Sequence, residues 1–386
     1  MVSRKHGDVI PPDVVIQAVD SRISAVRTQS IDFSFNELAD MYSDQELIID
    51  PEFQRLFRWS EGAQSRFIES LLLELPIPPI FLIEREDRTY ELIDGLQRFS
   101  SYLHFRGQLL SPAGQLEQAL VLSDCDIVRE LNGATLQDLP RSLEIKLKRS
   151  YVRAEILRKE SDPRLRYYMF KRLNTGGEQL SEQEVRNATI RLLSNDFNQF
   201  IISLSENDDF QYCIGIISDG QRSRRFDHEL VLRFFAFKNY IEGYRHDVAG
   251  FLTEYMESIS DPTDQTHDFD YEHEREIFKT TFKALRLLSA ESGVNDRIFG
   301  SVLPKTSAPR GQFSVYHYEG IVLGLQAVLA RIDLENSGQI TELAVALREG
   351  KADPEFLAST GAGKNDSRPL KDRVTFFARK FGEAVP

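Results

Sequence analysis

The chain has 386 residues, 41% hydrophobic and 28% charged. At ~150 residues per domain this indicates a soluble globular protein of two or three domains, and it excludes a disordered chain. The net charge of −13 excludes an overall basic nucleic-acid-binding surface, although a local basic groove is compatible with it. Two cysteines without CxxC spacing exclude a disulfide scaffold and a thiolate zinc cluster. Together with the lack of a signal peptide or a long apolar run, they predict a cytoplasmic protein without membrane contact.

The first 160 residues predict a mixture of short strands and helices. Residues 1–30 are expected to form a polar arm with one or two amphipathic turns. Ser60 suits the N-cap of a helix that Pro76 ends. Residues 31–160 are therefore predicted to be an α+β domain. Its expected strands are 47–50, 80–83, 90–93, 120–122 and 151–157, and its expected helices are 62–75 and 142–148.

Residues 161–386 predict a mainly α-helical domain, because their apolar residues recur at helical spacing and few stretches alternate as strands do. The seven histidines are scattered, and no HExxH, paired-cysteine or Ser-His-Asp order is present. The expected helices are 165–173, 182–193, 227–242, 248–259, 275–288, 320–332 and 373–381.

The most informative segment is the turn Asp94-Gly-Leu-Gln-Arg98, which joins an expected strand to a helix. Gly95 permits a sharp bend, and the first turn of the helix directs backbone N–H groups and the positive end of its dipole outward. Arg98 could donate to phosphate oxygens, and Asp94 could hold a hydrated Mg²⁺ or orient a water. A structural turn with a surface arginine explains the same five residues.

A second candidate segment lies just before the expected helix at 62–75. Gln54, Arg55, Arg58 and Trp59, the only tryptophan, fall within six residues of one another. An exposed indole offers a stacking face for a base or a guanidinium. The alternative is that Trp59 is a hydrophobic plug beneath the helix.

A third candidate segment is the glycine-containing turn Asn174-Thr-Gly-Gly177. Its consecutive N–H groups could form an anion-binding nest, to which Asn174, Thr175 and Gly176 would contribute. Ser181 and Glu184 have the spacing of a capping box, which predicts the start of a helix at about residue 182. Ligand contact by this turn is a hypothesis, whereas the helix start follows directly from the residue types.

Basic side chains concentrate between residues 141 and 172, where eleven basic residues oppose four acidic ones. If folding gathers them, DNA could dock despite the negative total charge, since contact depends on the local potential. The alternative is an ordinary solvated surface. The candidates for DNA contact are Lys146, Lys148, Arg149, Arg222, Arg224 and Arg225.

Four motifs occur in one order: Phe53-Gln-Arg-x-Phe-x-Trp-Ser60, the Arg66-x-x-Glu69 helix with Pro76-Ile-Pro78, Asp94-Gly-x-Gln-Arg98, and Asn174-Thr-Gly-Gly-x-x-Leu-Ser181. This order, over roughly residues 30–190, resembles the ParB-like N-terminal domain of GmrSD-type modification-dependent restriction enzymes. The stretch Phe226–Ala236 looks like the helical continuation of that family. The resemblance implies a ParB/sulfiredoxin-like fold followed by a helical domain, and a nucleoside triphosphate site at the Asp94 turn.

The resemblance also implies roles for individual residues. Asp94, Gln97, Arg98 and Glu69 are the expected catalytic group, with Mg²⁺ on Asp94. The sequence departs from the family at Leu96, where a glutamine is usual, and no C-terminal His-Asn-His nuclease segment is found. The expected nucleotide-binding residues are Gln54, Arg55, Arg58, Trp59, Arg66, Gly95, Asn174, Thr175 and Gly176.

Three functions stay open at this level. The first is a nucleoside triphosphatase whose nucleotide state gates the binding of DNA, or of a partner nuclease or methyltransferase, in anti-phage defence. The second is a nucleotide- and DNA-binding regulator without turnover, which Leu96 favours. The third is a DNA-nicking nuclease with a metal site among the acidic residues. A homo-oligomer is compatible with each.

Overall fold

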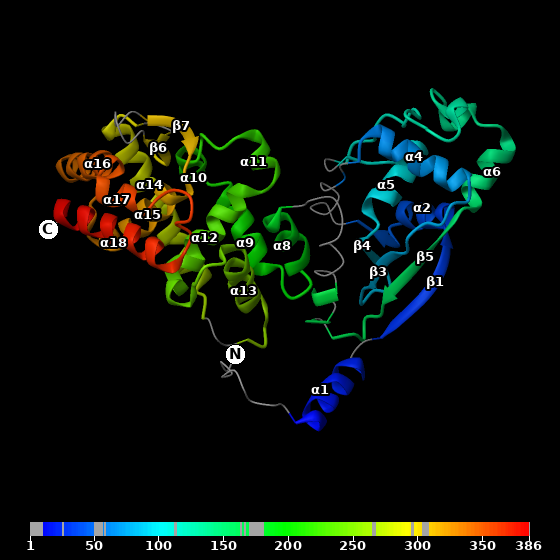
Figure 1. Ribbon diagram of the computed structural model, residues 1–386, viewed down its shortest axis with the longest axis horizontal. Coiled ribbons are helices and arrows are strands. Elements are labelled where there is room, and N and C mark those ends of the chain that lie inside the picture. The colour runs from blue at the N-terminus through cyan, green and yellow to red at the C-terminus, as the bar shows by residue number, and fades with distance from the viewer. Residues whose placement is uncertain are drawn as a thin grey trace. The chain divides into compact units, whose positions relative to one another are not determined.

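The computed structural model of the chain describes residues 11–24, 27–49, 57, 59–111, 114–162, 164–165, 167–169, 181–264, 268–294, 297–302 and 309–385. The chain falls into two compact units, Met1–Gln179 and Leu180–Pro386 (Figure 1). The first is a mixed α/β unit and the second is mainly helical, as the sequence predicted. The units divide between Gln179 and Leu180, whereas the domain boundary was expected at residue 160.

A five-stranded mixed sheet forms the centre of the first unit. Strand β5 pairs antiparallel with β1 and parallel with β3, so that Ala154 lies opposite both Ile31 and Ile80. Strands β3 and β4 form an antiparallel hairpin, and β2 is parallel to β4. In sheet order the strands are β1 (Thr28–Ser34), β5 (Tyr151–Leu157), β3 (Ile80–Glu84), β4 (Tyr90–Asp94) and β2 (Leu47–Ile48).

Helices cover one face of this sheet (Figure 1). The alternation along β5 explains the arrangement, because Val152, Ala154 and Ile156 are buried on the helical side whereas Arg153 is exposed on the other. A further helix, α1 (Pro12–Ser24), precedes β1. The covering helices are α2 (Phe35–Ser43), α4 (Glu61–Leu72), α5 (Leu96–Phe105) and α6 (Arg141–Arg149).

The strand expected at residues 120–122 is wrong. Leu120 and Leu122 are buried, but their backbone bonds go to a helix end and a loop: the N–H of Leu120 donates to His104 O at 3.1 Å, and that of Leu122 to Ala134 O at 2.9 Å. The apolar alternation therefore reflects a loop packed against α5. Strand β1 was not expected, and it begins at Thr28, inside the predicted arm.

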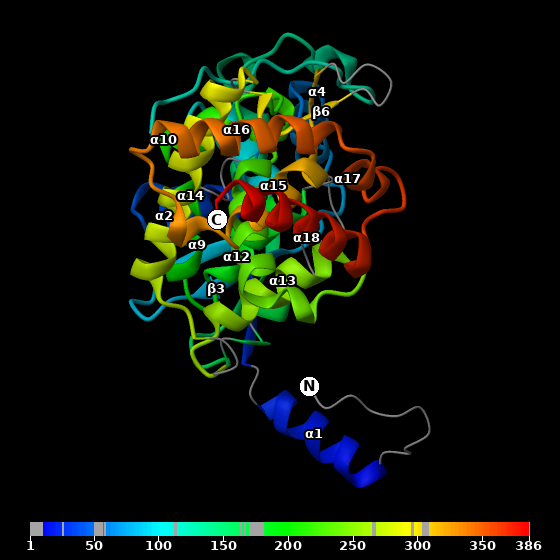
Figure 2. The ribbon, with the colours of Figure 1, turned by 90° about the vertical axis from the view of Figure 1, so that its left-hand side faces the viewer.

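The second unit is a helical bundle with one short hairpin, β6 (Gly300–Val302) and β7 (Pro309–Phe313). Helix α18 packs on α15 and α16 (Figure 2). A Cβ at Gly324 would lie 2.5 Å from the Cβ of Phe377, so glycine permits this close approach. The helices are α8 (Glu182–Ile190), α9 (Asp196–Ser205), α10 (Asp208–Cys213), α11 (Asp219–Ser223), α12 (Phe226–Tyr240), α13 (Val248–Ser260), α14 (Tyr271–Ser292), α15 (Val315–Leu325), α16 (Ser337–Ala352), α17 (Pro354–Ala358) and α18 (Ser367–Ala384).

Candidate functional site

The turn after β4 has the geometry that its sequence predicts. Strand β4 ends at Asp94, Gly95 adopts φ 103° and ψ 10°, and α5 begins at Leu96. A Cβ at residue 95 would lie 2.4 Å from Cγ2 of Ile80, so both the left-handed backbone and the packing require glycine. Gly95, as the N-cap of α5, has no side chain that could cap the helix, and the first turn of a helix is the part whose N–H groups suit an anion.

Arg98 connects the turn to the loop between α4 and β3. Its guanidinium donates to Asp94 Oδ2 at 2.8 Å and to the carbonyl oxygens of Pro78 and Pro79 at 2.5 and 3.0 Å. The side chain of Arg98 is 13% exposed and that of Asp94 is 33% exposed. The arginine expected to bind phosphate thus has three protein acceptors, and an anion would have to compete with them. The two carbonyl acceptors are backbone atoms and could not be predicted from the residue types.

Gln97 and Trp59 belong to one hydrogen-bonded chain that joins α4 to α5. The N–H of Trp59 donates to Gln97 Oε1 at 3.0 Å, and the Trp59 carbonyl accepts from Gln64 Nε2 at 2.8 Å. Gln64 Oε1 lies 2.8 Å from Nδ1 of His104. The Trp59 ring is half-buried, with its centroid 5.9 Å from that of Phe67 in an edge-on contact. This contact matches the hydrophobic-plug alternative for the indole.

Glu69 and Arg66 hold a different segment, the loop at residues 124–128. Glu69 is buried, and its Oε1 accepts from the N–H groups of Ile127 and Val128 at 3.0 and 2.5 Å. Arg66 Nη1 donates to the Asp124 carbonyl at 3.5 Å. These partners are backbone groups, so sequence spacing carried no signal for them.

Six of the expected nucleotide-binding residues lie outside the described residues. They are Gln54, Arg55, Arg58, Asn174, Thr175 and Gly176. The capping box that follows them is confirmed, since Ser181 Oγ accepts from the Glu184 N–H at 3.2 Å and the Ser181 N–H donates to Glu184 Oε2 at 2.8 Å.

The candidate DNA-binding residues form one group in each unit. Lys146, Lys148 and Arg149 occupy the last turn of α6, where Lys146 Nζ lies 3.3 Å from Glu74 Oε1 and Arg149 is exposed. In the second unit, Arg224 is exposed and the half-buried Arg222 donates to Gln211 Oε1 at 2.5 Å. Arg225, with φ 59°, immediately precedes α12.

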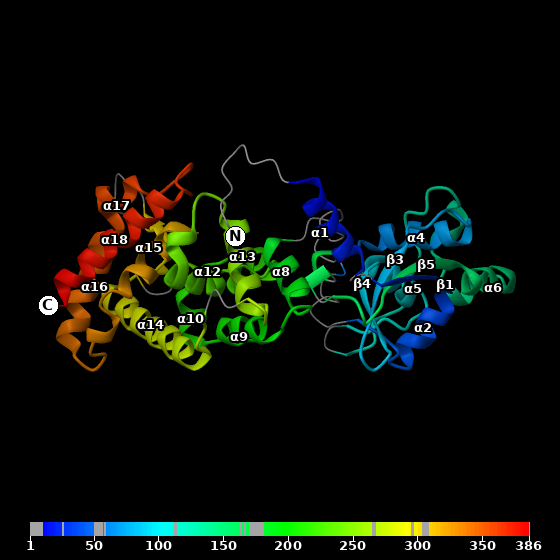
Figure 3. The same cartoon turned by 90° about the horizontal axis from the view of Figure 1, so that it is seen from below.

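A groove of about 920 Å³ adjoins the basic turn of α6, and we call it the α4–α6 groove. Its lining comes from α4, the loop at residues 74–79, α6 and the start of β5. Figure 3 shows α4, α6 and β5 from below. Leu75 is 42% exposed there and Tyr151 is 68% exposed. Its lining includes Leu71, Leu75, Ile77, Ile145, Arg149 and Tyr151.

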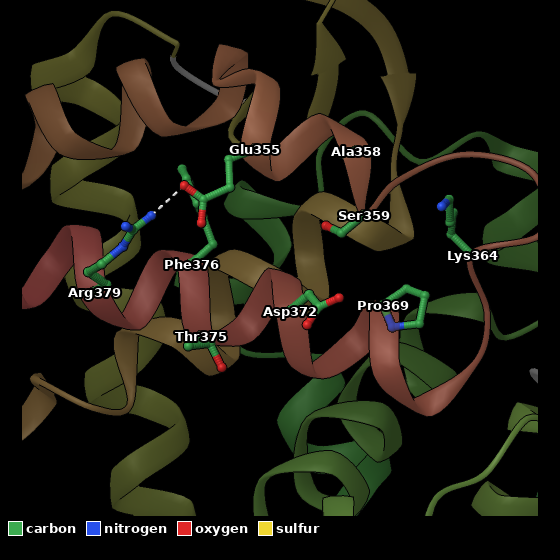
Figure 4. A pocket seen from close by; sticks show the side chains of 9 residues that line it. All are labelled: Glu355, Ala358, Ser359, Lys364, Pro369, Asp372, Thr375, Phe376 and Arg379. Carbon is green, nitrogen blue, oxygen red and sulfur yellow. Dashed lines mark hydrogen bonds and ion pairs between the residues drawn. The ribbon is translucent and has the colours of Figure 1, made fainter.

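A second hollow, of about 450 Å³, lies between α17 and α18 in the helical unit (Figure 4). Its charged lining is balanced, because Lys364 and Arg379 accompany Glu355 and Asp372, and Arg379 donates to Glu355 at 2.6 Å. The preceding turn is closed by the Lys364 N–H donating to the Gly361 carbonyl at 3.2 Å. The hollow therefore has no charge preference for a phosphate.

Within the described ranges, no three His, Cys, Asp or Glu side chains gather where they could hold a metal ion. None of the helices in the described part of the chain is long and apolar enough to cross a bilayer.

Residues 37–191 match the family model described as GmrSD restriction endonuclease, N-terminal domain. The match begins in α2 and ends directly after α8, so it includes the Asp94 turn, the lining of the α4–α6 groove except Asp32, and the Ser181 capping box. No curated protein and no solved structure matches the chain. The order of the four motifs predicted this family, and the match over residues 37–191 confirms the resemblance.

Proposed function

We propose that residues 37–191 bind a nucleoside triphosphate at the Asp94–Arg98 turn, and that this binding controls how a restriction-type defence protein acts on DNA. The observation that carries the proposal is the turn itself. Gly95, which has no capping side chain, places the N-terminus of α5 directly after β4, with a partly exposed carboxylate and an arginine beside it. The family match supplies the restriction context.

Arg98 would act by exchanging partners. Mg²⁺ at nucleotide sites is commonly held by one or two carboxylates together with phosphate oxygens, so the single carboxylate of Asp94 fits that role. Once Asp94 turns away from Arg98, the guanidinium is available to phosphate oxygens. When the Arg98 guanidinium moves to the phosphate, its hydrogen bonds to the Pro78 and Pro79 carbonyls break.

Release of these carbonyls offers a route from nucleotide to DNA. The loop at residues 74–79 lines the α4–α6 groove together with Lys146 and Arg149, which are candidates for phosphate contact. A shift of this loop would therefore change the surface that carries those two cations. A partner nuclease or methyltransferase would act on the DNA so bound.

A second candidate function is binding without turnover. The two groups best suited to position a water, Gln97 and Glu69, each accept hydrogen bonds from backbone N–H groups at 3.0 Å or less. These bonds hold α5 and the 124–128 loop in place, and their loss would disturb the fold. This engagement supports a regulator that senses the nucleotide and leaves it intact.

Titration calorimetry with ATP, GTP and CTP in the presence of Mg²⁺ tests the binding. We expect one nucleotide to bind, and Arg98→Ala to weaken it at least tenfold, about 1.4 kcal/mol. Arg88→Ala is the matched control, because Arg88 also pairs with a carboxylate four residues away, Glu84, in the same unit. Equal affinity in the two variants would refute the assignment of the turn.

Phosphate release separates the two candidate functions. Release above the Arg98→Ala background indicates hydrolysis, whereas binding of both the nucleotide and its non-hydrolysable analogue without release indicates a sensor.

DNA affinity should fall steeply with salt, and Lys148→Ala should reduce the slope of log K against log salt by about one. A flat salt response would exclude α6 as a phosphate-binding element.

A further inference from the structure

Helix α1 presents an apolar surface that the rest of the structure leaves uncovered. Val14, Val15, Ile16 and Val19 are 53%, 43%, 56% and 50% exposed. At about 3.6 residues per turn, Val15, Ile16 and Val19 share one side of the helix, and Gln17 lies on the opposite side. Three large aliphatic side chains on one side of a short helix are typical of a helix that packs against a partner.

The α4–α6 groove has the complementary character. Its floor and rim contain Leu71, Leu75, Ile77, Ile145 and Tyr151, of which Leu75 and Tyr151 are largely exposed. A volume of about 920 Å³ is sufficient for several aliphatic side chains. Helix and groove are thus two uncovered apolar surfaces in one unit of the chain.

We propose that α1 docks into the α4–α6 groove of its own chain. Three residues separate Ser24 at the end of α1 from Thr28 at the start of β1, so the two Cα atoms lie at most about 14 Å apart. Folded back along β1, the 13 residues of α1 span about 20 Å. Strand β1 covers about the same length from Thr28 to Ser34, which pairs with Tyr151 at the rim of the groove.

The charged residues of α1 determine its orientation in the groove and the kind of surface that it binds. Asp13 and Asp20 are seven residues apart and so lie on one edge of the helix, next to Ile16. The groove carries the exposed Arg149, while Lys146 and Arg153 already pair with Glu74 and Asp32. The fold-back orientation brings the Asp13 end of α1 to Arg149. Membrane-surface helices are rich in Lys and Arg, whereas α1 carries two aspartates and the single Arg22, so its charge favours a protein groove over a lipid surface.

Engineered disulfides in the full-length protein test the docking. Cys125 and Cys213 are buried, so added cysteines are the accessible pair. We expect Val15→Cys with Tyr151→Cys to form an intrachain disulfide under mild oxidation, at a rate independent of protein concentration. The control is Gln17→Cys with Tyr151→Cys, which should form it at least several-fold more slowly. Equal rates in the two pairs, or a disulfide-linked dimer, would overturn the proposal.

Hydrogen exchange provides a second measurement that needs no cross-link. Val15→Asp with Val19→Asp should speed amide exchange roughly tenfold over residues 13–20, whereas Gln17→Asp should leave it unchanged. Asp13→Arg and Arg149→Asp should each raise the exchange rate, and the two together should restore it. Failure of the charge-reversed pair to restore protection would contradict the orientation, and equal exchange in all variants would contradict the docking.

Discussion

At the scale of single residues, the Asp94 turn depends on Gly95. Its φ of 103° is costly for any residue with a side chain, and a Cβ would lie 2.4 Å from Ile80 Cγ2. We expect Gly95→Ala to lower the free energy of unfolding by about 2–4 kcal/mol in urea denaturation. Gly114→Ala is the control, because Gly114 also has a positive φ but nothing within 4 Å of an added Cβ. Equal losses would show that the contact with Ile80 is unimportant.

Lys351 makes stability depend on pH. It is 2% exposed, its Nζ donates to the Arg297 carbonyl at 2.8 Å, and burial lowers its pKa to about 7. The unfolded chain, with a lysine pKa near 10.5, then binds this proton more tightly than the folded one. The contribution of Lys351 is therefore least favourable below pH 7 and improves as pH rises toward 10.5.

The substitution Lys351→Met removes this dependence. The free energy of unfolding of the variant minus that of wild type should be about 2–3 kcal/mol larger at pH 6 than at pH 9. His317 stays neutral over this range, since burial and the charge of Lys351 lower its pKa to about 3. Urea denaturation of both proteins at the two pH values measures the difference. A variant that follows wild type at both would mean that Lys351 is solvated when charged.

At the scale of elements, a ladder of buried charges joins three helices of the second unit. Glu229 and Arg233 on α12 pair at 2.8 Å, Arg233 reaches Glu319 on α15 at 2.9 Å, and Glu319 reaches Arg373 on α18 at 2.6 Å. Glu319 and Arg373 are each 3% exposed. Each cation has a carboxylate partner, so the ladder ties the helices together without an isolated buried charge.

Glu319→Gln should therefore be strongly destabilising, by about 3–5 kcal/mol, because it leaves Arg373 buried without a counter-charge. Glu242→Gln is the control: Glu242 pairs with Lys371 at 2.5 Å, but its side chain is 80% exposed, so we expect less than about 1 kcal/mol. Thermal denaturation of the two variants gives the comparison. Similar transition temperatures would mean that water reaches the ladder.

Neighbouring residues in the sequence predicted most helices and strands of the first unit, but not the distant segments with which they pair. The caps at Ser60 and Ser181 and the hairpin of β3 and β4 follow from neighbouring residues, and all are confirmed. Strand β1 was missed because its exposed polar residues are held by pairing with β5, more than a hundred residues away. The acceptors of Arg98 were missed for the same reason, since they are carbonyl oxygens some twenty residues earlier.

At the scale of the whole molecule, the family match and the compact units end at different places. The match extends to residue 191, whereas the first unit ends at Gln179, so α8 lies within the family match by sequence and within the helical unit by packing. Arg186 on α8 is buried, and it donates to Thr253 Oγ1 at 3.0 Å and to the Ala249 carbonyl at 3.1 Å. The matched segment thus contributes a helix to the core of the second unit.

Two fragments of the helical unit test whether α8 is needed for the stability of that unit. A fragment of residues 192–386 lacks α8 and leaves Glu229 without Arg186, which lies 3.6 Å away, and His228 without Asn187, which lies 2.8 Å away. We expect it to be at least about 3 kcal/mol less stable in urea than a fragment of residues 180–386. Equal stability would place α8 with the first unit. A large difference would place α8 with the second unit, although it lies within the family match.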